Sequence, residues 1–440
     1  RVFYPLNFFA HGAIVYLYKK ISEVLFMGIK IGVVGAGFFS GDFIRLFKLH
    51  PDVEEVVIAD VVPERVKDAM ARHGLKRGYL GLDEMLAEAP DIDSVAIFTQ
   101  RHLHGPMVIK ALEAGKNVYS AVPIACEIDE IGEIIETVKK TGKVYMMGET
   151  CYYYPCAIYC RQKYKEGGFG KFVYGESQYY HDISEMYADF KHSAGDDWRK
   201  PAGIPPMFYP THSISMILSA LPGEHIKKVS CFGYEDHNAD DIYGNGKNYW
   251  DNPFSNETAL FSLSGGGVIR VNEFRRVGIN KPSSYITAFY GDEGSYECSV
   301  TQHTFQRGHS APDGPRIEYL DELINTYRYV EDKHAGTIDM TKDPCSVRYI
   351  EGFSPIQDLS RLPEPFREKN IHAHYNSHPF LVDDFVRAVK DDKLPPNNAW
   401  DAARYMVPGL VAHESALKGG ITMDVPDFGD APKNFSPLYE

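Results

Sequence analysis

The feature that most constrains the fold is a glycine-rich turn between an apolar strand pattern and a helix pattern. Residues 29–34 are IKIGVV, the turn GAG follows, and the next segment, FFSGDFIRLFKLH, is typical of a helix. Gly35 permits a tight turn, and Gly37 lets the backbone approach a pyrophosphate that the helix N-terminus stabilises. The pattern predicts a dinucleotide-binding turn, with Phe38 and Phe39 beside the nucleotide.

A second strand pattern, EVVIAD, ends in a carboxylate that could hold the adenosine ribose. Asp60 lies roughly twenty residues after the glycines, where an acidic side chain binds the ribose hydroxyls. A carboxylate repels a 2′-phosphate, and the next residue is Val61 rather than an arginine that would neutralise one. The alternative, an aspartate that only ends a strand, does not account for the combined pattern. We therefore expect NAD in preference to NADP.

Strand and helix patterns continue to alternate as far as residue 149, which predicts an α/β domain with a doubly wound parallel sheet. Ligands of such sheets bind outside the carboxyl ends of the strands. Three segments should therefore surround one cleft and its cofactor. They contribute Thr99, Gln100, His102 and His104, then Ala121 and Pro123, and finally Glu149.

Charge and cysteine content argue against several classes of partner. The 440 residues carry a formal net charge of −14, which repels nucleic-acid phosphates and disfavours anionic membrane surfaces. A compact anionic substrate could still bind at a local basic site. The seven cysteines are irregularly spaced, which favours buried thiols over disulfides or a metal site. We expect no nucleic acid, no membrane and no metal, and a cytoplasmic location.

The chain divides into a nucleotide-binding part and a longer second part. The first 26 residues are apolar but interrupted by polar residues, so neither a membrane span nor a signal peptide is expected there. Polar stretches at 237–257 and 301–316 are expected to form loops. Our boundaries are a tag or non-native extension at 1–26, a nucleotide-binding domain at 27–150, a substrate-binding and oligomerisation domain at 151–426 whose last helices (378–418) pack back on it, and a tail at 427–440.

Three long segments carry motifs that occur together in one enzyme family. They are IGVVGAGFFS, SVAIFTQRHLHGPMVIKALEAGKNVYSAVP and HPFLVDDFVRAVKDDKLPPNNAWDAARYMVPGLVAHESALKGG. This set resembles the Gfo/Idh/MocA oxidoreductases over nearly everything after Met27. The resemblance implies an N-terminal Rossmann domain and a C-terminal α+β domain whose open, mainly antiparallel sheet covers the nicotinamide. It also implies a homo-oligomer, either a dimer or a tetramer.

One position departs from that family. Ordinary members have Glu-Lys-Pro where this chain has Ala-Val-Pro at 121–123, and their lysine assists proton transfer at the substrate hydroxyl. Val122 cannot do so, so another residue must handle the proton or the chemistry must differ from simple alcohol oxidation. Pro123 can still shape the backbone beside the nicotinamide.

A narrower resemblance bears on this departure. GETCYYYP, GKFVYGESQYYHD, DDWRK and FYPTHSISMIL are similar to motifs of NAD-dependent glycoside hydrolases of the α-N-acetylgalactosaminidase type, which also tend to lack the lysine. Matched motif by motif, the resemblance implies site residues at Glu149, Tyr179, His181, Arg199, Tyr209 and His212. The loop 186–197 differs from that group, so the sugar is left open.

Oxidation of a sugar hydroxyl requires a base that takes the proton while hydride leaves the carbon. His212 is our first candidate because imidazole titrates near neutral pH and Pro210 suits a first helical turn. Tyr209 would then share its helical face. The alternative for His212 is a helix-start histidine bonded to backbone. Glu149 could be an acid, a base or the partner of a cation.

Several further side chains have two interpretations. Tyr179 and His181 alternate on a predicted strand, so they face either the cleft or solvent together. Tyr152 could form an aromatic wall for a sugar or pack in the core. Arg199, with Trp198 beside it, could bind a substrate carboxylate or acyl oxygen.

Three histidines, His372, His374 and His378, lie together near the C-terminal helices. No carboxylate spacing supports a metal site there, which favours a loop that caps a long helix. His378 could still line the substrate cleft.

Three functions fit these residues. The first is an NAD-dependent oxidoreductase that acts on a pyranose sugar or glycoside. The second is a net redox-neutral glycosidase in which a C3 ketone acidifies the C2 proton, the C1 substituent is eliminated, water adds and hydride returns, with no need for two flanking carboxylates. The third is a non-catalytic NAD- or sugar-binding protein. Val122 favours the second and third functions, whereas the many tyrosines and histidines of the second part disfavour the third.

Overall fold

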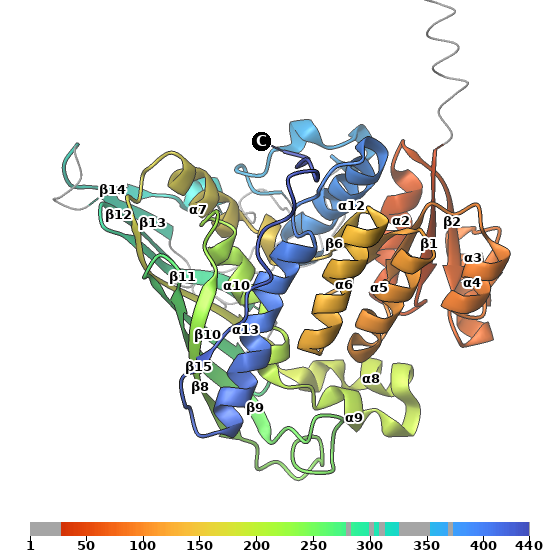
Figure 1. The fold of residues 1–440 in the computed structure, drawn as a ribbon, viewed down its shortest axis with the longest axis horizontal. Coiled ribbons are helices and arrows are strands. Elements are labelled where there is room, and N and C mark those ends of the chain that lie inside the picture. Colours follow the sequence, from red (N-terminus) through yellow and green to blue (C-terminus); the bar gives the residue numbers. More distant parts are fainter. Residues whose placement is uncertain are drawn as a thin grey trace, which may run out of the picture.

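The structure, a computed structural model, describes residues 28–278, 283–298, 303–307, 313–324, 353–367 and 373–439. The extension proposed at 1–26 and His372 lie outside these residues. Two sheets form two domains side by side, and helices α12 (Ala373–Asp391) and α13 (Ala399–Leu417) lie between them (Figure 1).

The N-terminal domain contains a six-stranded parallel sheet in the order β3-β2-β1-β4-β5-β6. Its strands are β1 (Ile29–Val34), β2 (Val53–Ala59), β3 (Gly78–Tyr79), β4 (Ser94–Ile97), β5 (Asn117–Ser120) and β6 (Tyr145–Met147). Its helices are α2 (Ser40–Leu49), α3 (Pro63–His73), α4 (Leu82–Glu88), α5 (His104–Glu113) and α6 (Ile128–Thr141). The predicted doubly wound sheet is confirmed, and its strand order reverses between β1 and β4, where dinucleotides bind.

Both faces of this sheet are buried, which explains its apolar, β-branched strands. Ile31 and Val33 belong to one buried cluster with Phe43 of α2. Val34 belongs to the cluster on the other face, together with Val108 of α5. Because helices cover both faces, the carboxyl edge of the sheet is left for a ligand.

The second domain contains a nine-stranded sheet in the order β14-β13-β12-β11-β7-β10-β9-β8-β15. Its strands are β7 (Phe172–Tyr180), β8 (Ile226–Glu235), β9 (Phe254–Leu263), β10 (Val268–Phe274), β11 (Ser283–Gly291), β12 (Gly294–Cys298), β13 (His303–Arg307), β14 (Arg316–Tyr319) and β15 (Met423–Asp424). β7 and β10 pair in parallel, whereas the other pairs are antiparallel. The mainly antiparallel sheet that the resemblance implies is therefore confirmed.

The two stretches expected as loops are partly strands. Residues 303–307 form β13, because Phe305 is fully buried and pairs with Tyr296 of β12. The end of the other stretch begins β9, where Phe254 is also buried. The aromatic residues Phe254 and Phe305 within these polar stretches were the sequence signal for the strands.

Among the residues that the structure describes, helices cover one face of the second sheet and leave the other open. α7 (Pro155–Lys165) and α10 (Thr211–Leu218) pack on β11 and β7, and α13 packs on β8. The connection from β7 to α10 forms shorter helices, α8 (Tyr187–Ala194) and α9 (Arg199–Ala202), with 3-10 turns η3 (Ile183–Met186), η4 (Gly195–Asp197) and η5 (Pro206–Phe208). This connection runs beneath the N-terminal domain (Figure 1). It therefore brings second-domain side chains toward the carboxyl edge of the parallel sheet.

The C-terminal segment contacts both domains. α12 places Phe380 and Phe385 in the cluster around β1 and α2, and it also packs on the turn Thr150–Tyr153 at the start of the second domain. α13 contacts α6 as well as β8 and α10. The tail folds back, with the backbone N–H of Leu394 donating to Ser436 at 2.8 Å. None of the helices in the described ranges is both long and apolar enough to cross a membrane.

Candidate active site

The turn after β1 has the geometry that a dinucleotide requires. Gly35 has φ +100°, and a Cβ there would lie 2.6 Å from the carbonyl oxygen of Phe98, so no other residue fits without strain. A Cβ on Gly37 would meet no atom within 4 Å, which leaves space beside this backbone. Phe38 and Phe39 are exposed at the start of α2, where a nucleotide would cover them.

Asp60 holds this turn from the end of β2. Its carboxylate accepts hydrogen bonds from the backbone N–H of Ala36 at 2.8 Å and of Val62 at 2.9 Å. Each carboxylate oxygen retains a lone pair for a ribose hydroxyl. Arg65 lies 4.0 Å away, and its guanidinium also donates to the backbone carbonyl of His192 in α8. The carboxylate is therefore fixed in orientation at the end of β2, beside the glycine turn.

The loops after β4 and β5 form the middle of this edge. His104 is buried, and its ring nitrogens lie 2.7 Å from the carbonyl of Pro123 and 3.1 Å from that of Thr99. His104 therefore lies between the two loops inside the protein, and both of its ring nitrogens face backbone carbonyl groups rather than a cofactor. Ala121 and Val122, by contrast, are half-buried, and Val122 packs against the core.

The neighbouring Gln100 and His102 reach the second domain. The amide of Gln100 donates to the carbonyl of Ser193 in α8 at 3.5 Å. The ring of His102 lies 5.0 Å from that of Tyr249. Both positions predicted for the cofactor therefore lie at the junction between the domains.

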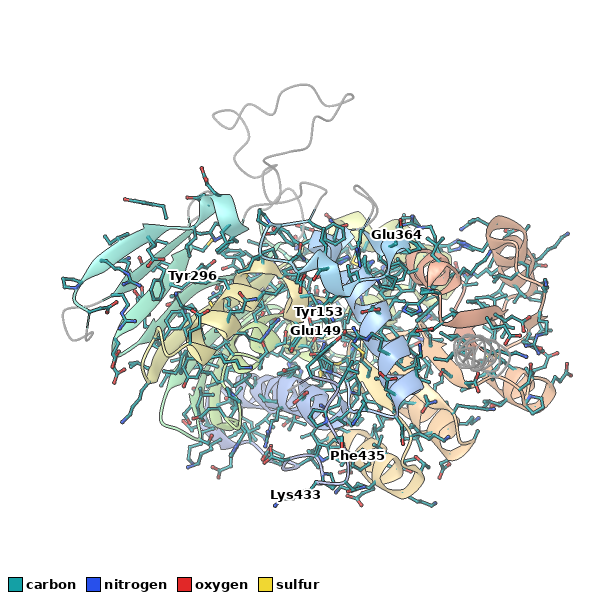
Figure 2. All side chains as sticks on the ribbon, turned by 90° about the horizontal axis from the view of Figure 1, so that it is seen from above. Glu149, Tyr153, Tyr296, Glu364, Lys433 and Phe435 are labelled. Carbon is teal, nitrogen blue, oxygen red and sulfur yellow. The ribbon has the colours of Figure 1, made fainter. Side chains whose placement is uncertain are left out.

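Glu149 and His212 form the centre of the site. Glu149 follows β6 and precedes the 3-10 turn η2 (Thr150–Tyr153), and its carboxylate accepts from the backbone N–H of Cys151 at 2.8 Å. The same oxygen lies 2.8 Å from Nδ1 of His212, which is the second residue of α10. Glu149 is fully buried in the middle of the molecule (Figure 2). Because a carboxylate only accepts, the proton of His212 lies on Nδ1 and Nε2 carries a lone pair.

Three further predicted residues surround this pair. The ring of Tyr179 lies 4.8 Å from that of His212, and the ring of Tyr209 lies 5.8 Å from it. The hydroxyl of Tyr179 lies 2.5 Å from Nδ1 of His181. Burial raises the pKa of Tyr179, and burial followed by Arg275 and Arg101 lowers the pKa of His181 to about 3. Tyr179 therefore donates its proton to a neutral His181.

Three other predicted residues lie elsewhere. Arg199 is exposed, and its Nε donates to the backbone carbonyl of Asp240 at 2.8 Å. Trp198 is buried in a small cluster with Phe190 and other apolar side chains of the β7–α10 connection. Tyr152 packs under the guanidinium of Arg161, with Cζ 3.9 Å from the ring centroid. The structure thus joins the five predicted catalytic residues and separates these three from them.

Sequence analysis missed two arginines beside this cluster. Arg275 Cζ lies 4.7 Å from the ring of Tyr179, and its guanidinium bonds Glu273 at 2.8 Å. Burial raises the pKa of Glu273 to about 7, while Arg275 opposes that rise. Arg101 Cζ lies 4.6 Å from the ring of Tyr209. The signal for Arg101 was its position directly after a strand that ends at the predicted cleft.

The histidines near α12 approach the cofactor turn. His374 and His378 place their rings 6.0 Å and 5.6 Å from the ring of Phe39. His374, Tyr375 and Asn376 have φ values of +57°, +52° and +53°, a left-handed turn before the helix proper. The expected cap of a long helix therefore exists, and it forms one wall beside α2.

Glu149, Cys151 and His212 also satisfy the distance criterion for metal ligands, because one donor atom of each lies within 4.8 Å of the others. Their hydrogen bonds to the Glu149 carboxylate already account for this proximity. Burial raises the pKa of the Cys151 thiol well above its ordinary value, so the sulfur is protonated at neutral pH. We assign no metal to this group.

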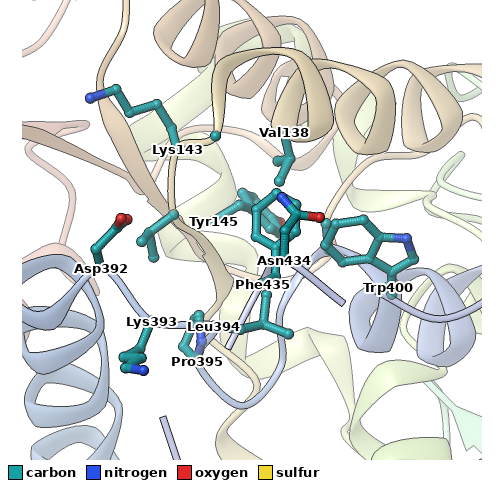
Figure 3. A pocket seen from close by; sticks show the side chains of 13 residues that line it. Val138, Lys143, Tyr145, Asp392, Lys393, Leu394, Pro395, Trp400, Asn434 and Phe435 are labelled. Carbon is teal, nitrogen blue, oxygen red and sulfur yellow. The ribbon is translucent and has the colours of Figure 1, made fainter. Parts of the chain in front are cut away.

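A separate cavity of about 180 Å³ lies at the amino end of β6, lined by Tyr145, Leu394, Trp400 and Phe435 among others (Figure 3). Parallel sheets bind ligands at the opposite, carboxyl edge. This cavity lies beside the folded-back tail, and we do not include it in the site.

Comparisons with known proteins agree with this geometry. The model of the Gfo/Idh/MocA family, an oxidoreductase family with an NAD-binding Rossmann fold, matches residues 29–149. A glycosyl hydrolase family 109 protein of Bacteroides fragilis is 33% identical over 366 residues, which cover 80% of this chain and 79% of the relative. An alpha-N-acetylgalactosaminidase of another strain of that organism has the same identity and coverage.

Solved structures share the fold at lower sequence identity. Levoglucosan dehydrogenase in complex with NADH and L-sorbose is 18% identical, with a TM-score of 0.67 over 91% of this chain and 100% of that one. An oxidoreductase from Agrobacterium radiobacter in complex with NAD⁺, L-tartaric acid and magnesium is 15% identical, with a TM-score of 0.64 over 90% and 98%. The protein is therefore an enzyme with a nicotinamide-dinucleotide-binding Rossmann domain, and it belongs to the Gfo/Idh/MocA oxidoreductase family, within the branch that contains the family 109 glycoside hydrolases.

Proposed function

We propose that this enzyme uses NAD to oxidise a ring hydroxyl of a pyranose sugar or glycoside, with His212 as the base that takes the hydroxyl proton. The observation that carries the proposal is the 2.8 Å hydrogen bond between Glu149 and His212, inside a tyrosine-lined cluster at the carboxyl edge of the parallel sheet. Bound nicotinamide supplies the hydride acceptor. The residues of the chain supply the proton transfers and the binding contacts.

His212 has the arrangement of a general base. Its Nε2 has no hydrogen-bond partner among the described residues, while Nδ1 is held by Glu149. When Nε2 takes a proton, the buried carboxylate stabilises the imidazolium, as in other carboxylate-oriented histidines. This pair replaces the lysine that other family members have at the position of Val122.

Tyr179 and His181 provide a second route for a proton. The Tyr179 hydroxyl donates to neutral His181 and lies in the same aromatic cluster as His212. A hydroxyl in that position can hold a substrate oxygen or pass a proton to it. We propose this pair as the second acid–base group.

Asp60 and its surroundings favour NAD over NADP. The carboxylate is already oriented by two backbone N–H groups, and it would lie against the 2′-phosphate of NADP. Arg65 lies nearby, but it is engaged with Asp60 and with a carbonyl of α8. We therefore propose NAD as the cofactor.

A second candidate function is net redox-neutral glycoside hydrolysis. It is favoured by Val122 and by the two histidine–tyrosine sites, because elimination and hydration need a second acid–base group besides the oxidation base. The printed names of the Bacteroides fragilis relatives also support it. In this route NADH does not accumulate.

One experiment separates these functions. Nitrophenyl glycosides and free sugars are incubated with the enzyme, with and without added NAD, while NADH absorbance and nitrophenol release are followed. NADH formation from a free sugar supports the dehydrogenase, and nitrophenol release without NADH supports the hydrolase. Neither signal with any sugar contradicts the proposal, and calorimetric binding of NAD or sugar without turnover would then indicate a binding protein.

We also propose a homo-oligomer, a dimer or a tetramer, in the cytoplasm. The open face of the nine-stranded sheet exposes Phe232 and Leu260 on the neighbouring strands β8 and β9, and Ile317 and Tyr319 on the edge strand β14. Exposed large apolar side chains on an open sheet favour an interaction surface. Light scattering after size exclusion should give twice or four times the chain mass. Leu260→Arg should then lower that mass, whereas a monomeric wild type would contradict this part of the proposal.

A further inference from the structure

Arg101 differs from the other charged groups of the site because its guanidinium is uncompensated. It begins the 3-10 turn η1 (Arg101–Leu103), directly after the β4 loop. Within the ranges that the structure describes, this guanidinium makes no hydrogen bond and no ion pair, and its contacts are the rings of Tyr209 at 4.6 Å and Phe190 at 5.4 Å. Desolvation lowers the pKa of Arg101 to about 10, so it remains charged at neutral pH.

Arg275 provides the comparison within the same cluster. Its guanidinium bonds the Glu273 carboxylate at 2.8 Å and the backbone carbonyl of Pro206 at 3.2 Å. The other buried carboxylate, Glu149, is bonded to His212. Neither carboxylate is therefore paired with Arg101, and this half-buried guanidinium has N–H donors left for the anion of a ligand.

We propose that Arg101 binds a carboxylate of the pyranose substrate, which makes the preferred substrate an acidic sugar of the uronic acid class. This inference rests on the proposed sugar oxidation. The planar guanidinium fork matches a carboxylate through two parallel hydrogen bonds. The Tyr209 ring is shared between Arg101 and His212, so a sugar held by the carboxylate lies beside the proposed base.

The position of Arg101 favours the substrate over the cofactor pyrophosphate as the source of the anion. The pyrophosphate is expected at Gly35–Gly37, where the N-terminus of α2 already supplies backbone N–H donors. Both rings that contact Arg101 come from the second domain, from α8 and from the segment before α10. Arg101 therefore faces the side on which the sugar is proposed to bind.

Calorimetry on the NAD-saturated enzyme tests this inference. The probes are D-glucuronate and D-galacturonate, each compared with its neutral parent, D-glucose or D-galactose. We expect at least one uronate to bind the wild type about tenfold or more tightly than its parent. Arg101→Met should weaken that uronate about 30-fold, while neutral-sugar and NAD affinities stay within about threefold.

Two further variants serve as controls. Arg101→Lys keeps the positive charge but loses the planar guanidinium fork, so its uronate affinity should lie between those of Arg101→Met and the wild type. It also reports the effect of the fork if Arg101→Met folds poorly. Arg72→Met removes an exposed arginine at the end of α3 and should leave all affinities unchanged.

The outcomes separate this inference from the proposed function. Equal wild-type affinity for uronates and neutral sugars, or no uronate binding, overturns the role of Arg101 even if neutral sugars are oxidised. A loss of NAD affinity in Arg101→Met with an unchanged uronate preference would assign the guanidinium to the pyrophosphate instead. The proposed function fails separately, if neither acidic nor neutral sugars or glycosides give NADH or a released aglycone.

Discussion

Two histidines in one cleft have neighbours of opposite charge. His212 donates to the buried carboxylate of Glu149, whereas His181 accepts the Tyr179 hydroxyl and lies near Arg275 and Arg101. A carboxylate favours a proton on imidazole, and burial with nearby guanidinium groups disfavours it. The same residue type therefore donates to a carboxylate at one site and is held neutral at the other, and the ring of Tyr179 lies between the two.

The largest effect should come from removing the base. His212→Ala should lower kcat/KM about 1,000-fold, because no other side chain at that position can take the hydroxyl proton. Steady-state kinetics with the best sugar measures it, and NAD affinity by calorimetry controls for folding. Retention of wild-type activity would remove His212 from the mechanism.

The carboxylate behind His212 should have the next largest effect. Glu149→Gln keeps the side-chain volume and an acceptor oxygen but loses the charge that stabilises the imidazolium, so kcat should fall about 30-fold. The pH profile of kcat is the diagnostic measurement, because a general base is inactive when protonated and its acidic limb should therefore shift to lower pH when the imidazolium is less stable. An unchanged profile would mean that Glu149 has only a packing role.

The second site should matter less. Tyr179→Phe keeps the ring contact with His212 and removes the hydroxyl that donates to His181, so kcat/KM should fall about tenfold. If kcat/KM instead falls as far as in His212→Ala, the two histidine sites contribute equally to catalysis, and the proposed difference between them is wrong.

The smallest effect concerns stability at acidic pH. The pKa of His181 is lowered to about 3 in the folded state from an ordinary value of 6.5, so the unfolded chain binds this proton first. The resulting stability is present above pH 6.5 and is lost as the pH falls toward 3. His181→Asn removes this loss, so between pH 7 and 5.5 its Tm should fall by roughly 1 °C to 2 °C less than that of the wild type. Equal Tm changes would show that His181 is not held neutral.

The cofactor half of the molecule could be predicted well because its determinants are local. Gly35 and the strand before it are adjacent in sequence, and Asp60 follows at a fixed distance, so a short pattern specifies the turn and the carboxylate. The strand order then follows from alternating patterns and the handedness of their connections. His104 was the exception, because a buried histidine whose ring nitrogens face two carbonyl groups has the same sequence signature as one that lines a cleft.

The substrate half could be predicted only where a motif marked it. Glu149 and His212 lie 63 positions apart, and only the fold of the second sheet brings them together. Trp198 and Arg199 matched a motif, yet the connection before α10 places Trp198 in a separate cluster and directs Arg199 to the backbone of Asp240. Whether a guanidinium is paired or unpaired, as for Arg101, depends on neighbours that no local pattern specifies.

The most direct test of the whole account is a calorimetric titration of NAD and NADP into the purified protein, after mass spectrometry has shown whether a nicotinamide nucleotide is already bound. We predict one NAD per chain, NADP binding about tenfold weaker or more, and loss of most NAD affinity in Asp60→Ala. A protein that neither contains nor takes up either nucleotide would contradict the account.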